Sequence, residues 1–446
     1  MLDKKNIYMI GIGGIGMSAL ARYFVSIGKN VAGYDRTQTP LCEALENEGI
    51  AIHYEDNLNK IDKTFKDPET TTVVYTPAIP DDMGELNYFR DNGFELIKRA
   101  LALGQISAAT TCLAVAGTHG KTTTSALLAH LFKQGGQNIA AFLGGIASNY
   151  QSNFLAPSDS DILVAEADEY DRSFLQLKPA GAIITSVDSD HLDIYGNPEE
   201  LKATFAKFRD CVTETAIVHK DTGLSGITYG IETDADYCGK NVRVENHNYV
   251  FDIQLPDGTI IEEIHSGLPG RHNVENAIGA AALALNFGLS AEDVKAGIAS
   301  FKGVRRRFEY HIKRDELVYI DDYAHHPAEI NALVSSVREL YPNKRISGIF
   351  QPHLFTRTRD FEEGFIEALS KLDELVLMDI YPAREKPIPG INSSALFSKI
   401  NIDNKHHLST PEILTHFANN KPEIILTIGA GDIDKLINPL KMKLSQ

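Results

Sequence analysis

Residues 111–124 have the sequence TCLAVAGTHGKTTT, and this stretch decides the fold class. Cys112–Ala116 is a short apolar run, which predicts a buried strand. A helix is predicted over Thr122–Gln134, so a strand, a glycine-containing loop and a helix follow one another directly. Glycines let backbone N–H groups approach phosphate oxygens, and the start of the helix adds the positive end of its dipole. The stretch therefore predicts a phosphate-binding loop in an α/β fold.

Two side chains of this loop carry the chemistry of ATP binding. Lys121 supplies a full positive charge for the β- and γ-phosphates, and the Thr122 hydroxyl can ligate Mg²⁺. The form GxxGKT is shorter than the common GxxxxGK[ST] pattern, so a glycine-rich turn with an incidental lysine is the alternative. The strand before the loop and the helix after it favour ATP. The predicted ATP-binding residues of the loop are Gly117, Thr118, His119, Gly120, Lys121, Thr122 and Thr123.

Acidic residues follow the next two predicted strands of this segment. Glu166-Ala167-Asp168-Glu169 comes after the strand Asp161–Val164, and Glu166 lies nearest the strand end. A carboxylate there, beside a phosphate loop, is placed to hold Mg²⁺; a solvated acidic turn is the alternative. The strand Ala182–Thr185 is followed by 188–193, DSDHLD. His191 in that cluster is predicted to ligate the metal or contact the γ-phosphate, although a lone histidine can also be purely structural.

The N-terminal segment contains a second glycine loop. Gly11-Ile12-Gly13-Gly14-Ile15-Gly16 fits GxGxxG between a predicted strand, Asn6–Ile12, and a predicted helix, Met17–Ile27. Asp35 ends the next strand about 20 residues on, as in dinucleotide-binding folds. The pattern suits NAD, a nucleotide-diphosphate substrate, or close strand–helix packing with no ligand.

Further polar clusters lie towards the C-terminus. His272-Asn273-Val274-Glu275-Asn276 opens an alanine-rich helix, where an asparagine can contact an adenine edge or simply cap the helix. In the third segment, predicted strands are followed by three clusters: 321–327, DDYAHHP; 350–359, FQPHLFTRTR; and 429–433, GAGDI. A carboxylate in the first cluster could hold ribose hydroxyls, and arginine suits bidentate binding of a carboxylate. Clusters at successive strand ends outline a crevice.

Alternating strands and helices predict three domains. We expect an N-terminal Rossmann-like domain over 1–107 and a central P-loop domain over 108–308. The central domain combines a parallel sheet with a small antiparallel region, the hairpin Tyr249–Leu255 and Thr259–Ile264 around Pro256-Asp257-Gly258. A C-terminal Rossmann-like domain is expected over 309–446.

The composition argues against several classes of binding partner. The chain has 446 residues and a formal net charge of −17, which disfavours nucleic acid and anionic membranes. Phosphate ligands would therefore need local positive charge, for which 305–307 and the pair Arg357 and Arg359 are candidates. The four cysteines form no CxxC pair, and no signal peptide or membrane span is expected. These features predict a cytoplasmic protein.

Nine motifs occur in order along the whole chain: GIGGIGMS, AGTHGKTTT, EADEYDRSFL, DSDHLDIYG, PGRHNVENA, DDYAHHPAEI, FQPHLFTRTRDF, DIYPAREKPIPG and GAGDI. In these motifs the sequence resembles the Mur ligases, most closely those members that add L-alanine to UDP-N-acetylmuramate. The resemblance implies an ATP- and Mg²⁺-dependent enzyme of peptidoglycan precursor synthesis. It implies three domains, for the UDP-sugar, ATP and the amino acid. As partners it implies the two substrates without nucleic acid or membrane, in a monomer or weak homodimer.

The resemblance also implies roles for individual residues. It assigns the first glycine loop to the UDP-sugar rather than to NAD, and Mg²⁺ to Thr122, Glu166 and His191. The UDP-sugar residues are Gly11, Gly13, Gly14, Ile15, Gly16 and Asp35. Further ATP contacts are His272, Asn273, Asn276, Arg307 and Asp322. The catalytic residues are Lys121, His191 and His325, and the amino acid contacts are His353 and Arg357.

The chain departs from the family pattern at two positions. Leu354 stands where many members have arginine, and Tyr170 where serine is frequent. No lysine is aligned with the carbamylated lysine of other members.

Three rival functions are open. One rival is a recycling ligase that attaches a tripeptide to the same UDP-sugar. The others are an NAD-dependent dehydrogenase with an ATPase domain and a non-catalytic nucleotide-binding regulator.

Overall fold

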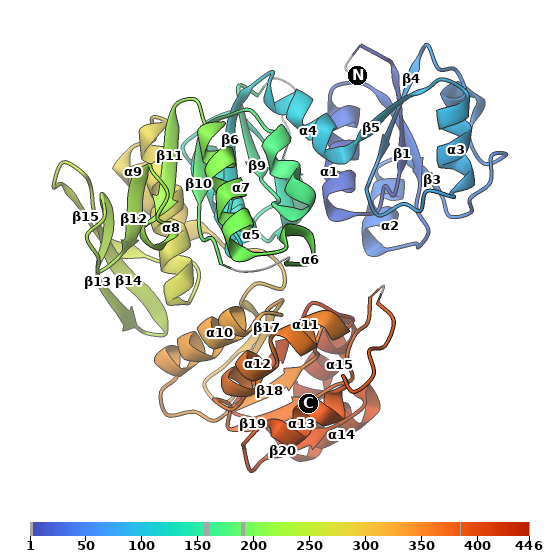
Figure 1. The fold of residues 1–446 in the computed structure, drawn as a ribbon. Helices are drawn as coiled ribbons and strands as arrows, with labels where there is room; N and C mark the ends of the chain where they lie inside the picture. The colour runs from blue at the N-terminus through green and yellow to red at the C-terminus, as the bar shows by residue number, and fades with distance from the viewer. Residues whose placement is uncertain (1–2, 156–159, 189–191, 384, 446) are drawn as a thin grey trace. The chain divides into compact units, whose positions relative to one another are not determined.

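The computed structural model describes residues 3–155, 160–188, 192–383 and 385–445, which form three β-sheets flanked by helices (Figure 1). The contacts divide the chain into two compact units. The first comprises Met1–Lys240, Asp252–Ile264 and Glu275–Lys302, and the second Asn241–Phe251, His265–Val274 and Gly303–Gln446. The predicted α/β class is confirmed. The predicted domain boundaries stay a prediction.

The first sheet is parallel and has the strand order β3-β2-β1-β4-β5. The order reverses between β1 and β4, and ligands of such sheets bind at the carboxyl ends of the strands beside this reversal. The first glycine loop follows β1 and therefore lies at that position. Its strands are β1 Asn6–Ile10, β2 Asn30–Tyr34, β3 Ala51–His53, β4 Thr71–Tyr75 and β5 Glu95–Lys98; its helices are α1 Ile15–Ser26, α2 Pro40–Asn47, α3 Gly84–Asp91 and α4 Arg99–Ser107.

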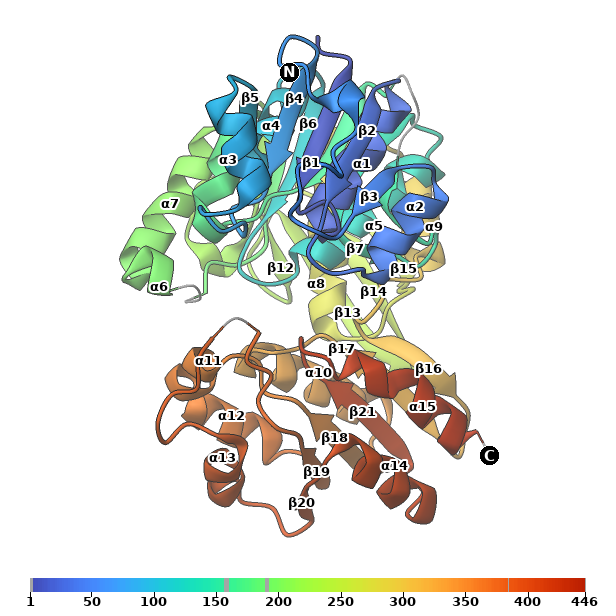
Figure 2. The same ribbon diagram turned by 90° about the vertical axis from the view of Figure 1, so that its right-hand side faces the viewer.

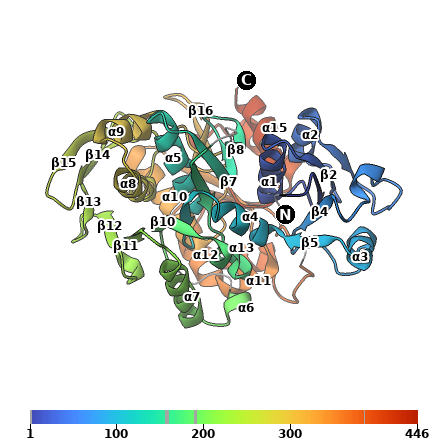
Figure 3. The ribbon, with the colours of Figure 1, turned by 90° about the horizontal axis from the view of Figure 1, so that it is seen from above.

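The second sheet has ten strands in the order β15-β14-β13-β12-β11-β10-β6-β9-β7-β8. Because β6 lies between β9 and β10, the polar residues that follow these neighbours flank the phosphate loop. The predicted hairpin is β14 and β15, which continue the same sheet. Helix α9 lies alongside α5 (Figure 3). The strands are β6 Thr111–Ala116, β7 Ile139–Ala147, β8 Ser152–Leu155, β9 Ile162–Glu166, β10 Pro179–Ile184, β11 Thr215–His219, β12 Ile227–Ile231, β13 Tyr237–Glu245, β14 Asn248–Gln254 and β15 Ile260–His265. The helices are α5 Lys121–Gln134, α6 Leu192–Tyr195, α7 Pro198–Asp210, α8 Arg271–Asn286 and α9 Ala291–Ser300, with 3₁₀ turns at Tyr170–Gln176 and Lys220–Thr222; a further 3₁₀ turn, Lys63–Phe65, lies between β3 and β4 of the first sheet.

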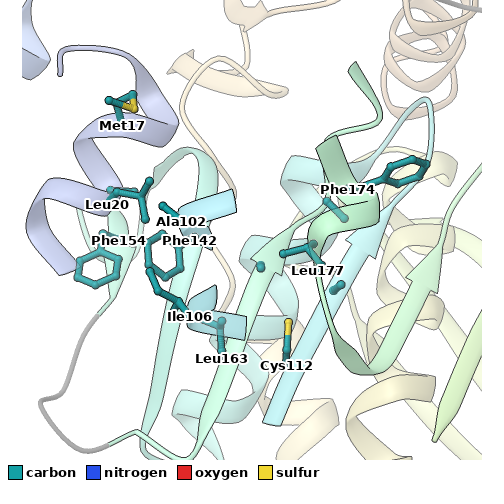
Figure 4. Close-up of a cluster of buried hydrophobic side chains, with 14 of the residues drawn as sticks. Met17, Leu20, Ala102, Ile106, Cys112, Phe142, Phe154, Leu163, Phe174 and Leu177 are labelled. Atoms are coloured by element: carbon teal, nitrogen blue, oxygen red, sulfur yellow. The ribbon is translucent and has the colours of Figure 1, made fainter. Parts of the chain in front are cut away.

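One hydrophobic core joins the first two sheets within the first unit. Met17 and Leu20 follow one another along α1, Leu20 lies near Phe154 of β8, and Ile106 of α4 lies close to Phe142 of β7 (Figure 4). All five side chains are buried. Burying a large apolar side chain contributes about 1.5–3 kcal/mol, so this core fixes the helix after the first glycine loop against the sheet of the phosphate loop.

The third sheet belongs to the second unit and has the order β16-β17-β21-β18-β19-β20. Only β16, at one edge, is antiparallel to its neighbour. Helices α14 and α15 cover one face of the sheet, and α10 and α12 the other (Figure 2). Its strands are β16 Glu309–Lys313, β17 Val318–Asp322, β18 Ile346–Phe350, β19 Glu374–Leu377, β20 Lys405–His407 and β21 Ile424–Ile428. Its helices are α10 Pro327–Leu340, α11 Phe355–Asp360, α12 Glu362–Leu369, α13 Ser393–Lys399, α14 Thr410–Asn419 and α15 Asp434–Leu444.

None of the described helices is long and apolar enough to cross a bilayer. All four cysteines are free thiols, as their spacing predicts.

A buried carboxyl group in the first sheet's core makes stability depend on pH. Glu85 of α3 is fully buried; it accepts a hydrogen bond from the Tyr8 hydroxyl at 2.8 Å, and His53 Nε2 lies 3.4 Å from its Oε1. Burial raises the pKa of Glu85 to about 7, although the hydrogen bonds from Tyr8 and Asn57 oppose the shift. The folded state therefore binds a proton that the unfolded state, with an ordinary pKa near 4.5, releases at lower pH.

We expect the stabilisation from this proton to be present below about pH 4.5 and lost as the pH rises through 7. Glu85→Gln keeps an acceptor for Tyr8 but does not titrate. The free energy of unfolding of Glu85→Gln relative to the parent, measured by urea titration, should therefore rise by about 2 kcal/mol from pH 5 to pH 8. The exposed Glu43→Gln is the control. Parallel pH profiles for parent and Glu85→Gln would contradict the assignment.

Candidate active site

The phosphate loop connects β6 to α5 and is tied to the segment that follows β10. Gly117 has a φ of +135°, which side chains rarely adopt. The Thr118 hydroxyl donates to the Asp188 carbonyl at 2.9 Å, and the His119 N–H donates to the Ser186 hydroxyl at 2.9 Å. Two neighbouring strand ends therefore hold the loop in one conformation, which orients its backbone N–H groups before any ligand binds.

Lys121 is the first residue of α5, and its ammonium group turns back over the loop. It donates to the Gly117 carbonyl at 2.6 Å and to the Thr118 carbonyl at 3.2 Å. It also pairs with both oxygens of Glu169, at 2.9 and 2.7 Å. Since an ammonium group has three donors, contact with a phosphate requires at least one of these bonds to exchange.

The charge of Lys121 is secured by the acidic turn after β9. Burial alone lowers the pKa of Lys121, but the carboxylates of Glu169, Asp168 and Glu166 outweigh burial and raise it. The lysine is therefore fully protonated at neutral pH. The sequence placed Glu169 in this acidic cluster but did not identify it as the partner of Lys121.

Thr122 and Glu166, the predicted magnesium ligands, lie together. The Thr122 hydroxyl donates to Glu166 Oε1 at 3.2 Å, while the Gly144 N–H of β7 donates to Oε2 at 3.1 Å. A hydroxyl and a carboxylate are the oxygen donors that Mg²⁺ prefers, so the pair fits this ion. His191, the third predicted ligand and a predicted catalytic residue, lies outside the described residues.

Three other predicted ATP contacts lie at the same loop. His119 Nε2 is 3.8 Å from Asp188 Oδ2, and Thr123 is buried in the first turn of α5. A Cβ placed on Gly120 would lie 2.5 Å from Asn276 Oδ1, so the Asn276 amide of α8 touches the loop. Their proposed roles in binding ATP stay predictions.

The first glycine loop is shaped by Asp35, which was predicted to bind the ligand directly. Asp35 Oδ2 accepts the Gly13 N–H at 2.8 Å, and a Cβ on Gly13 would lie 2.3 Å from Cys42 Sγ. Gly11 has a φ of +82°. Helix α1 begins at Ile15, and its N-cap, Gly14, provides no side-chain cap, so the first N–H groups of the helix are available to an anion.

Arg99 is a further candidate site residue, which the sequence analysis did not identify. It begins α4, and a Cβ on Gly16 would lie 2.4 Å from its Nη1. Its Nη2 is 3.6 Å from Asp168 Oδ2 in the acidic turn after β9. A small pocket there is lined by Arg99, Glu166, Asp168 and Ser173 with apolar neighbours. The available signal was a basic residue directly after a strand end, which is weak without knowledge of what lies opposite.

In the second unit, Asp322 at the end of β17 serves the backbone. Its two carboxylate oxygens accept the N–H groups of Phe308, at 2.7 Å, and Ala324, at 2.8 Å. Burial raises the pKa of Asp322 to about 6, while the charge of Arg307 opposes the rise. Asp322 therefore fixes the arginine-containing segment to the strand end, and its predicted contact with ribose stays a prediction.

His325, a predicted catalytic residue, is held by backbone and carboxylate partners. Its Nδ1 lies 2.9 Å from the Tyr323 carbonyl and 3.4 Å from Glu329 Oε2. Burial lowers the pKa of His325, although Glu329 acts in the opposite direction. Arg307 extends towards the same glutamate, with Nη1 3.9 Å from Oε1. A neutral imidazole can accept a proton at neutral pH.

The two predicted amino acid contacts lie beside His325. Arg357 Nη1 is 3.4 Å from His353 Nδ1, and the rings of His325 and His353 are 6.1 Å apart. Burial, with the neighbouring His325 and Arg357, lowers the pKa of His353 to about 4. The guanidinium is thus the charged group among these three side chains, as binding of a carboxylate requires. Leu354, at a φ of +70°, begins the turn that presents Arg357.

The two remaining predicted adenine contacts, His272 and Asn273, also belong to the second unit. Asn273 is buried, and its side-chain amide donates to the Pro269 carbonyl at 2.6 Å. Because α8 begins at Arg271, Asn273 lies inside the helix and does not cap it. The interpretation as a helix cap is therefore wrong, and the adenine contacts stay predictions.

A short phosphate loop in the second of three sheets, with polar clusters at the strand ends of the other two, defines a nucleotide-binding α/β enzyme. Three family models match consecutive parts of the chain. They are the Mur ligase family, catalytic domain (residues 6–111), the Mur ligase middle domain (115–284) and the Mur ligase, glutamate ligase domain (306–431). The chain belongs to the Mur ligase family.

Several relatives match it over nearly their whole length. UDP-N-acetylmuramate–L-alanine ligase of Parabacteroides distasonis is 49% identical, covering 98% of this chain and 96% of the relative. The enzyme of the same name from Flavobacterium psychrophilum is also 49% identical, covering 99% and 98%. The crystal structure of UDP-N-acetylmuramate-alanine ligase from Thermotoga maritima has a TM-score of 0.85 at 27% identity, covering 99% of each chain. A murein peptide ligase from Psychrobacter arcticus shares the fold at a TM-score of 0.68 and 22% identity, also covering 99% of each chain.

Proposed function

We propose that this chain is an ATP-dependent ligase that joins the carboxylate of UDP-N-acetylmuramate to L-alanine and releases ADP and phosphate. The observation that carries the proposal is near-half identity, over almost the full length, to relatives named for this reaction. The phosphate loop with Lys121 supports the use of ATP. A cytoplasmic location and a monomeric or weakly dimeric state remain predictions.

The proposed reaction has two steps. The sugar carboxylate attacks the γ-phosphorus of ATP, which forms a C–O–P acyl phosphate and releases ADP. The alanine amine then attacks the carbonyl, and the tetrahedral adduct collapses to the amide, phosphate and a proton. Phosphate leaves far more readily than oxide, so ATP makes the acyl transfer possible. The protein acts mainly by positioning its substrates and offsetting their charge.

The residues of each unit fit separate parts of this chemistry. Lys121 would neutralise charge on the transferring phosphoryl group, which crowds negative oxygens together. Arg357 suits the carboxylate of L-alanine, and neutral His325 is suited to take the proton of the attacking amine. Thr122 and Glu166 would hold Mg²⁺, which when bound supplies further positive charge to the phosphates.

A phosphate-release assay tests the proposal against its rivals. We expect release from ATP only when UDP-N-acetylmuramate and L-alanine are both present. The tripeptide in place of L-alanine should give little release, whereas a recycling ligase would prefer it. A dehydrogenase would instead change the absorbance of NADH without releasing phosphate. ATP binding without acceptor-dependent release would indicate a regulator and contradict the proposal.

Arg99 provides a test of the first glycine loop as the UDP-sugar site. The positive guanidinium beside Gly16 and the free start of α1 together suit a pyrophosphate. Arg99→Ala should raise the KM for UDP-N-acetylmuramate about 10- to 100-fold, since a charged hydrogen bond contributes roughly 1.5–3 kcal/mol. The KM for L-alanine should change little. The exposed Arg90→Ala on α3 is the control, and an unchanged KM for the UDP-sugar would contradict the assignment.

A further inference from the structure

Three side chains with metal-binding atoms meet at one edge of the third sheet. Glu374 begins β19, His406 lies in the edge strand β20, and His416 lies in α14. One ligand atom from each residue lies within 4.8 Å of the other two. The cluster shares no residue with the predicted active site, and the proposed ligase reaction does not use it.

The distances within this cluster suit a tetrahedral ion. Glu374 Oε1 is 2.8 Å from His416 Nε2 and 4.0 Å from His406 Nε2. Tetrahedral zinc with bonds of about 2.0–2.1 Å holds its ligand atoms about 3.3–3.4 Å apart. The two observed distances lie on either side of that value. Movements of about half an ångström would bring the atoms into place, and His406 Nε2 would then exchange its contact with Asn404 Oδ1, at 3.0 Å, for the ion.

The carboxylate is oriented by its surroundings. Glu374 is buried, and the Ser347 hydroxyl of β18 donates to its Oε2 at 2.5 Å, which leaves Oε1 facing the histidines. Such outer hydrogen bonds orient the ligands of metal sites in proteins. Two imidazoles and one carboxylate favour Zn²⁺, Co²⁺ or Ni²⁺ over Mg²⁺ and Ca²⁺, which prefer oxygen donors.

A pocket opens beside the two histidines, lined also by Leu408, Pro411, Glu412 and Thr415. We do not assign Glu412 as the fourth ligand, because its Oε2 accepts the Ser409 N–H at 2.8 Å and hydroxyl at 2.6 Å and so holds the side chain in the capping box of α14. The fourth coordination position therefore faces the pocket and is suited to water.

A second cluster in the same unit shows what argues against a metal. Glu309, His311 and Asp321 also offer three ligand atoms within 4.8 Å. There, however, Arg306 Nε lies 3.2 Å from Asp321 Oδ2 and already supplies the positive charge. Among the described residues, the ion pairs of Glu374 are with the two histidines and with no lysine or arginine.

We propose that Glu374, His406 and His416 form a site for one divalent ion of the Zn²⁺ class, which ties β20 and α14 to β19. The alternative is a plain ion pair between Glu374 and His416 that needs no metal. His406 separates the two explanations, because its removal deletes a ligand and leaves the 2.8 Å contact between Glu374 and His416 in place.

The test uses the full chain without a histidine tag, dialysed against EDTA and then kept in excess Mg²⁺ to fill oxygen-ligand sites. A calorimetric titration with Zn²⁺ should show one equivalent of Zn²⁺ bound per chain. Co²⁺ should give the visible absorption of a tetrahedral complex. His406→Ala and His416→Ala should each weaken Zn²⁺ binding at least tenfold and abolish the cobalt spectrum.

His407→Ala is the matched control, because His407 neighbours His406 on β20 but pairs with Asp379 at 3.0 Å. It should bind Zn²⁺ as the parent does. Zn²⁺ should also raise the Tm of the parent and of His407→Ala, but not that of His406→Ala, with ligase turnover unchanged in His406→Ala. Equal Zn²⁺ binding by the parent and His406→Ala, or no binding by the parent, would overturn the proposal.

Discussion

Replacing Lys121 with alanine is expected to lower phosphate release, in the presence of UDP-N-acetylmuramate and L-alanine, by about a thousandfold or more. Removal of one preorganised donor to a developing charge commonly costs 10²–10³ in rate, and a full positive charge on a transferring phosphoryl group contributes more. Lys133→Ala is the matched control, because this lysine lies near the other end of the same helix, α5, with its ammonium group 4.7 Å from the centre of the Tyr150 ring.

The same substitution leaves the buried carboxylate of Glu169 without its positive partner, so loss of activity could reflect unfolding. The double variant Lys121→Ala with Glu169→Gln removes that unpaired charge. We expect the double variant to recover the urea midpoint of the parent and to remain inactive. Near-normal turnover in either variant, or activity restored together with stability in the double variant, would show that Lys121 does not act on the phosphates.

The sequence predicts the parts of this fold that local pattern determines. The strand Asn30–Tyr34 matches β2 at both ends, because an apolar run bounded by turn residues is a strong signal over short distances. Thr122 and Glu166 lie within hydrogen-bond distance, because one follows β6, the other ends β9, and the carboxyl ends of these adjacent parallel strands share one edge of the sheet; their role as magnesium ligands stays a prediction.

Features that depend on distant packing were not predictable from the sequence. Glu169 contacts Lys121 from the start of a turn. In this turn Asp171 and Arg172 both have left-handed backbone, at φ values of +55° and +56°. Left-handed backbone is uncommon for residues other than glycine, and although aspartate adopts it more often than most, two such residues in succession cannot be inferred from the sequence. Arg99 acquires its place opposite Gly16 only after α1 and α4 pack into one core, which involves residues far apart in the chain.

Gly117→Ala is expected to produce the second large loss. A Cβ on Gly117 would lie 2.0 Å from Thr185 Oγ1, and 2.9 and 3.0 Å from the backbone nitrogens of Ser186 and Thr185. These atoms cannot yield freely, because the Thr185 N–H donates to the Ala116 carbonyl across the β6–β10 pair at 2.9 Å. The φ of +135° adds backbone strain. Together these terms should cost roughly 3 kcal/mol of folding stability.

The loop can relieve the clash only by moving its backbone away from β10, and the N–H groups that we propose to bind the phosphates move with it. A displacement of about 1 Å commonly costs 10²-fold, so calorimetry should show ATP affinity reduced by about that factor. Gly136→Ala is the matched control: Gly136 also has a positive φ, +76°, but no atom lies within 4 Å of its added Cβ. It should lose about 1 kcal/mol of stability and no ATP affinity. If Gly117→Ala bound ATP as Gly136→Ala does, the loop from Gly117 to Thr122 would not be the phosphate site.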